Sequence, residues 1–74
     1  MQENTHGNIP FQAYLAHYEL QPVDVAVQSG VRYVTVWNIL KKKPVTAAHA
    51  AQVRRGLQKL TGVPYLGPIE TLPP

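Results

Sequence analysis

The residues of this chain with the clearest chemistry are its cations, and they are gathered in one stretch. All seven Lys and Arg residues lie between positions 31 and 60, where the sequence has no Asp or Glu. They are Arg32, Lys41, Lys42, Lys43, Arg54, Arg55 and Lys59. A segment with charge of one sign suits a polyanion, although the net charge of the whole chain is only +3.

Other kinds of chemistry have little support in the residue pattern. The histidines His6, His17 and His49 share no ligand spacing with one another or with a carboxylate. The four acidic residues are scattered along the chain, so no nucleophile is paired with a base. We therefore expect no catalytic centre, no metal site and no cofactor, and we do not expect an enzyme.

Length and composition limit the architecture. The 74 residues have room for one small domain, and without cysteine it cannot be held together by disulfides or thiolate-bound metal. No apolar run approaches the ~20 residues that a membrane-spanning helix needs. We expect a soluble protein that makes no contact with membranes, and the absence of cysteine is compatible with a reducing cytoplasm.

Apolar periodicity predicts an all-α fold for residues 9–63. The first helix should follow Pro10, and its apolar stripe is Phe11, Tyr14, Leu15 and Tyr18. The last helix should begin after Thr46 as N-cap and end at Gly62. The stripe of this last helix is Ala50, Val53, Leu57 and Leu60, with Gly56 as a mild defect unless another backbone approaches there.

Between these helices, residues 22–43 have the layout of a helix-turn-helix. One short helix is predicted over Pro22–Ser29 and a second over about 32–42, with Gly30 ending the first. At about 100° per residue from a buried Val36, the inward side of the second helix contains Tyr33, Ile39 and Leu40. Its outward side contains Val34, Asn38 and Lys41, with Thr35 and Trp37 on the flanks.

The two ends of the chain differ from the helical part. Residues 1–8 have no periodicity and are expected to form a flexible arm. Residues 64–74 form a Pro-rich tail that is too apolar for a solvated one, so we expect it either to form a dimer contact or to fold back over the core.

The spaced set of small and apolar residues resembles the Cro/C1 (XRE-type) helix-turn-helix domains of phage repressors and bacterial regulators. The residues that carry the resemblance are Leu20, Val25, Ala26, Gly30, Val31, Val36 and Ile39, followed by a basic turn, a proline and a helix that ends Leu60 to Val63. The resemblance implies a compact lambda-repressor-like bundle of four to five helices. It also implies binding to double-stranded DNA as a homodimer on a pseudo-palindromic site, in the prokaryotic or phage cytoplasm at the nucleoid.

The same resemblance implies roles for particular residues. Base contacts fall on Arg32, Tyr33, Val34 and Asn38. Contacts to the DNA backbone fall on Gln21, Thr35, Trp37, Lys41, Lys42 and Lys43. Family members often have a Thr-Gln pair where this chain has Gln21-Pro22, a Ser or Thr cap where it has Arg32, and an ion pair where it has Leu15 and Leu40.

Several of these residues also have a simpler interpretation. The three lysines suit a helix C-terminus, Arg32 suits a phosphate as well as guanine, and Val34 suits either a thymine methyl group or the exclusion of water. Tyr33 is either a base reader or a half-buried residue with its hydroxyl at a phosphate.

A second group of residues leaves a different class of function open. Trp37 either packs against the domain or contacts a groove or a partner. The α-helical cations Arg54, Arg55 and Lys59 form either a solvated face or a contact with a remote phosphate or an acidic partner. The alternative function is therefore a protein-interaction or antitoxin-like subunit that binds its partner through Trp37 or the tail.

Overall fold

The computed structural model describes residues 9–73, and the expected arm at residues 1–8 lies outside them. Within this range the chain forms four helices and no strand. The helices are α1 (Phe11–His17), α2 (Pro22–Ser29), α3 (Tyr33–Leu40) and α4 (Ala47–Thr61). The predicted all-α class is confirmed, and α2 has the predicted bounds.

Local signals place the beginnings of the helices. Pro10 immediately precedes α1, and Pro22 is the first residue of α2, where a missing N–H costs no helical hydrogen bond. The hydroxyl of Thr46 accepts a hydrogen bond of 3.0 Å from the backbone N–H of His49, so Thr46 is the predicted N-cap of α4. Arg32 precedes α3 without a side-chain cap, because its side chain has no acceptor.

The first three helices end in the same way, each with one residue in the left-handed conformation. These residues are Glu19, Gly30 and Lys42, with φ of 56°, 70° and 63°. The next N–H then bonds back to a carbonyl five residues earlier, as from Lys43 to Asn38 at 2.8 Å. Helix α3 is therefore shorter than the predicted 32–42, and the lysines lie in the turn that follows it.

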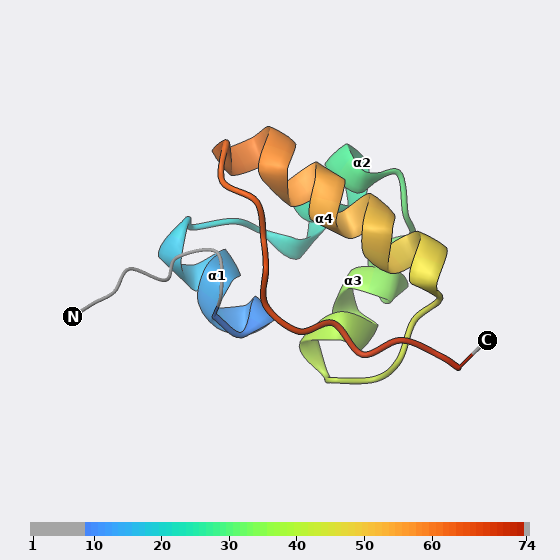
Figure 1. Cartoon of the computed structure of the whole chain (residues 1–74). Coiled ribbons are helices and arrows are strands. Elements are labelled where there is room, and N and C mark those ends of the chain that lie inside the picture. The colour runs from blue at the N-terminus through green and yellow to red at the C-terminus, as the bar shows by residue number, and fades with distance from the viewer. Residues whose placement is uncertain (1–8, 74) are drawn as a thin grey trace.

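Helices α2 and α4 pack closely, and Gly56 is what allows the approach (Figure 1). A Cβ at Gly56 would meet the side chain of Ser29 and would lie 2.9 Å from its Cα. Gly56 is therefore not a mere defect of the helix, because the backbone of α2 approaches it. Ser29 itself is buried.

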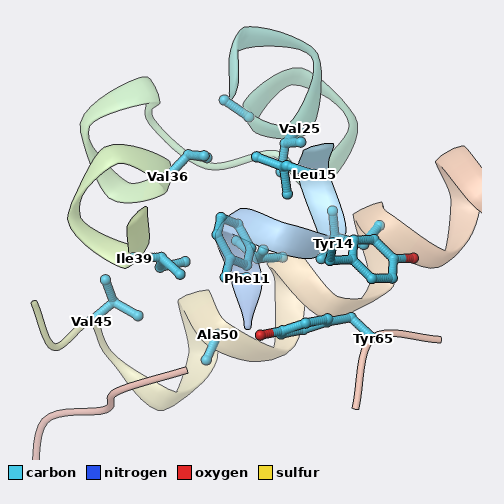
Figure 2. Packing of buried hydrophobic residues seen from close by; sticks show 12 residues of the cluster. Phe11, Tyr14, Leu15, Val25, Val36, Ile39, Val45, Ala50 and Tyr65 are labelled. Atoms are coloured by element: carbon cyan, nitrogen blue, oxygen red, sulfur yellow. The ribbon is translucent and has the colours of Figure 1, made fainter. Parts of the chain in front are cut away.

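The core lies between all four helices and the C-terminal segment (Figure 2). It receives Val25 from α2, Val36 and Ile39 from α3, and the aromatic rings of α1. Its members are Phe11, Tyr14, Leu15, Val25, Ala26, Val36, Ile39, Val45, Ala50, Val53, Leu57 and Tyr65. Most of the residues predicted to be apolar and inward are among them.

Residues 63–73 fold back across the domain, between α1 and α3 in Figure 1. Tyr65 is buried, and its ring packs edge to face on Phe11 and Tyr14, with centroids 5.7 and 5.0 Å apart. Further along, Val45 donates a hydrogen bond to the Glu70 carbonyl (3.0 Å) and accepts one from the Leu72 N–H (2.9 Å). Of the two arrangements expected for the tail, the chain adopts the one that covers its own core.

Candidate nucleic-acid interface

The connection between α2 and α3 is a turn of three residues, Gly30 to Arg32. It is held by the N–H of Val31, which donates to the Ala26 carbonyl at 3.2 Å. The two helices bury Val25 and Ala26 on one side of the turn and Val36 and Ile39 on the other. This packing leaves the opposite side of α3 facing outward.

Three large side chains form that outward side, which we call the α3 apolar face. Tyr33 is 50% exposed, Val34 is 54% exposed and Trp37 is 38% exposed. The rings of Tyr33 and Trp37 meet edge to face, with centroids 6.0 Å apart and an interplanar angle of 75°. Tyr33 was predicted to lie inward, but at the first turn of α3 it projects past the core.

Two other residues of α3 differ from their predicted placement. Thr35 was assigned to a flank and to contact with the DNA backbone, but its side chain is 7% exposed and is part of the packed side. Asn38 was assigned to the outward side and is half-buried. Of the α3 residues assigned to base contact, Tyr33 and Val34 are therefore the more accessible.

Cations lie at both ends of the α3 apolar face. Arg32 is exposed in an extended conformation just before α3. Lys41, Lys42 and Lys43 are exposed just after it, and we call them the lysine turn. Residues 33–40 between them have no charged side chain.

The lysine turn is anchored on its far side by the C-terminal segment. Val45 is 5% exposed, and both its backbone N–H and its carbonyl pair with that segment. The backbone that leads out of Lys43 is therefore held in place by residues 70–72. A segment distant in sequence thus positions three of the candidate DNA contacts.

Trp37 borders a groove at the edge of this surface. The groove, of about 320 Å³, runs between α1, the start of α2 and α3, and Trp37, Leu40 and Lys41 form one wall of it. Trp37 therefore packs along one edge while it is partly exposed. Gln21 is exposed at the N-cap position of α2, and its side chain makes no capping hydrogen bond.

Arg54 has a structural role that the sequence interpretation missed. The sequence predicts that it either lies on a solvated face or contacts a remote phosphate or an acidic partner. In the structure it is half-buried, and its Nη1 donates to the carbonyls of Tyr65 and Gly67, both at 2.9 Å. Its guanidinium also lies over the Tyr65 ring, 5.4 Å from the centroid. Arg55 and Lys59 are exposed, as predicted.

The two buried tyrosine hydroxyls are held in hydrogen bonds inside the domain. Tyr14 donates to the Val63 carbonyl at 2.6 Å and lies 2.7 Å from the Thr61 hydroxyl, whereas Tyr65 donates to the Pro68 carbonyl at 3.0 Å. Burial raises the pKa of Tyr65 to about 12, against the opposing charge of Arg54, and burial also raises the pKa of Tyr14. These groups stabilise the fold and are remote from the α3 apolar face in sequence.

Neither a metal-binding cluster nor a membrane-spanning helix is present in residues 9–73. No group of three or more His, Cys, Asp or Glu side chains in this range is arranged to hold a metal ion. In the same range, no helix combines the length and the hydropathy needed to cross a bilayer. Comparison of the chain with protein-family models, with curated proteins and with solved structures finds no match.

Proposed function

We propose that the chain is a sequence-specific DNA-binding regulator of transcription, repressor-like, in which α2 and α3 act as a helix-turn-helix. The observation that carries the proposal is the pairing of an unburied outer side of α3 with cations at both of its ends. Helix α3 would enter the major groove, and Arg32 and the lysine turn would contact phosphates beside it.

Dimensions and charge support this arrangement. An α-helix with its side chains is about 10 to 12 Å across, which fits a major groove about 12 Å wide. The salt slope is the change in the logarithm of the DNA-binding constant for each tenfold rise in salt concentration. Each phosphate neutralised by a cation should make this slope more negative by about 0.9. The lysine turn alone would therefore supply a slope of about −2.7.

Base selection would come from the side chains that project from α3 and its N-cap. Arg32 could donate two hydrogen bonds to guanine, and the exposed part of Asn38 could pair with adenine. Tyr33 and Val34 would meet base edges directly. Gln21 and Trp37 would lie beside the DNA backbone at the border of the same surface.

We propose further that the protein binds as a homodimer on a pseudo-palindromic site. Two copies of α3 would then lie about 34 Å apart, which is one turn of the duplex. Sedimentation of the full chain, with and without a duplex that contains the selected site, measures the number of protein copies in the complex and tests this prediction. A complex of one protein copy per duplex would contradict the dimer.

Selection from a random duplex library, followed by fluorescence anisotropy at two salt concentrations, tests the proposed function. Replacing Lys41, Lys42 and Lys43 by Gln should lower the salt slope by about 2.7. The matched control replaces the exposed cations Arg55 and Lys59 of α4 by Gln and should leave the slope near that of the wild type. Absence of salt-dependent binding to any duplex would refute the proposal.

A second candidate function is supported by the exposed valines of α2. Val23 is 52% exposed and Val27 is 73% exposed, one helical turn apart, and apolar surface of this kind is buried by protein partners. An antitoxin-like or assembly subunit would use these residues with Trp37. Loss of partner binding in Val27→Ser, with duplex binding absent in the wild type, would favour this candidate.

A further inference from the structure

The α3 apolar face is unusual for a helix side that is exposed in the isolated chain. A helix side that meets only water is normally polar. Here Tyr33, Val34 and Trp37 are at least a third exposed, and residues 33–40 contain no charge. The face therefore has the composition of a contact surface.

The cations around this face restrict what the partner can be. With Arg32 at one end and the lysine turn at the other, the complementary surface must be anionic at its edges and apolar at its centre. The major groove of duplex DNA has this pattern wherever pyrimidines carry a C5-methyl group on its floor, since phosphates line both rims. Most of a groove floor without such methyl groups offers only hydrogen-bonding atoms, which an apolar side chain cannot satisfy.

We propose that the α3 apolar face reads C5-methyl groups of pyrimidines in the major groove, so that specificity depends on a pattern of methyl groups. Val34 is the principal contact, because it is exposed at the first turn of α3. Tyr33 and Trp37 lie four residues apart and pack edge to face, so each limits the movement of the other beside Val34. This inference rests on the proposed function and specifies which feature of the DNA the site recognises.

Two natural bases carry this methyl group, thymine and 5-methylcytosine. They present the same methyl at the same place in the groove, but the neighbouring exocyclic group of thymine is an acceptor and that of cytosine is a donor. A valine side chain responds to the methyl alone. Discrimination between the two bases would require a polar neighbour such as Asn38.

The test uses the full chain and duplexes that contain the site selected from the random library. Each thymine of the site is replaced in turn by uracil, which removes only the methyl group. At the position read by Val34 the affinity should fall about fourfold, as expected for one buried methyl group. A third set of duplexes carries 5-methylcytosine or cytosine at that position, which distinguishes the two sources of the methyl.

Variants identify the side chain responsible. In Val34→Ala the thymine-to-uracil ratio at this position should fall toward one. Val27→Ala is the matched control, because Val27 is an exposed valine on α2 and its replacement should leave the ratio at about four. An unchanged ratio in Val34→Ala would remove Val34 from the contact.

The outcomes for this inference and for the proposed function are separate. Equal affinity for thymine and uracil at every position, in a protein that still binds its site with a steep salt dependence, would overturn methyl reading alone. Absence of binding to all duplexes would overturn both.

Discussion

The left-handed residue Lys42 in the lysine turn allows one substitution to raise the stability of the chain and to weaken the proposed DNA binding. Lys42 has φ of 63°, a conformation that costs a residue with a Cβ about 1 to 2 kcal/mol and costs glycine little. Glycine also makes the unfolded chain more flexible, which offsets roughly 1 kcal/mol of the gain. We therefore expect Lys42→Gly to raise the free energy of unfolding by up to about 1 kcal/mol.

The same change removes a candidate phosphate contact. Under the proposed function, Lys42→Gly should lower the salt slope of DNA binding by about 0.9 while the protein becomes more stable. Urea unfolding measures the first effect, and anisotropy with one duplex at several salt concentrations measures the second. Lys42→Ala should lower the slope equally without the gain in stability, because alanine keeps the Cβ.

The control is Glu19→Gly, since Glu19 has φ of 56° at the end of α1. The Glu19→Gly variant should be stabilised to a similar extent, and the salt slope of its DNA binding should stay that of the wild type. Unchanged stability in both glycine variants would show that the left-handed residues are not strained. A stabilised Lys42→Gly with the slope of the wild type would remove Lys42 from the phosphate contacts.

Three further predictions concern the packing of α4 and the C-terminal segment. The pKa of Tyr65 is about 12 in the folded chain and near 10 in the unfolded chain. The contribution of this difference to the free energy of unfolding is therefore complete below pH 10 and is lost as the pH rises toward 12. The free energy of unfolding should therefore fall by about 2 kcal/mol over that range, as measured by urea unfolding. Tyr65→Phe should flatten this fall while costing about 1 kcal/mol at neutral pH. Gly56→Ala, usually stabilising in a helix, should instead lower the thermal midpoint, because overpacking against Ser29 costs about 1 to 3 kcal/mol; an unchanged midpoint would mean that α2 can move away. Arg54→Met should cost about 2 kcal/mol in urea unfolding because two backbone carbonyls lose a charged donor, whereas Arg55→Met should change it by less than about 0.5; equal effects would contradict the role given to Arg54.

The local sequence determined where most helices begin and end. Pro22 and Gly30 bound α2, and Thr46 and Gly62 bound α4, because each of these residues has the backbone preference or side-chain acceptor that its position needs. Apolar spacing was equally informative about the core, since a helix can bury only one stripe. The residues proposed to contact DNA stay predictions that binding experiments must test.

The residues of α3 and the lysine turn do not by themselves predict where the helix ends. Lysine favours a helix, so the pattern extended α3 to residue 42, but Lys42 adopts the left-handed conformation and the chain turns. The turn leads directly to Val45, whose backbone pairs with Glu70 and Leu72. A contact across this distance in sequence leaves no local signal.

Orientation and long-range pairing were decided by the tertiary structure alone. A helical wheel gives the angles between side chains, but the neighbours of α3 decide which side is buried, and they cover Thr35 while they leave Tyr33 exposed. Arg54 looks like any surface cation in the sequence, and it becomes half-buried only because the chain returns and places two carbonyls within reach. The sequence alone thus specified the helices and their apolar stripes, because those depend on near neighbours, whereas the exposed face of α3 and the anchored lysine turn depend on contacts between distant segments.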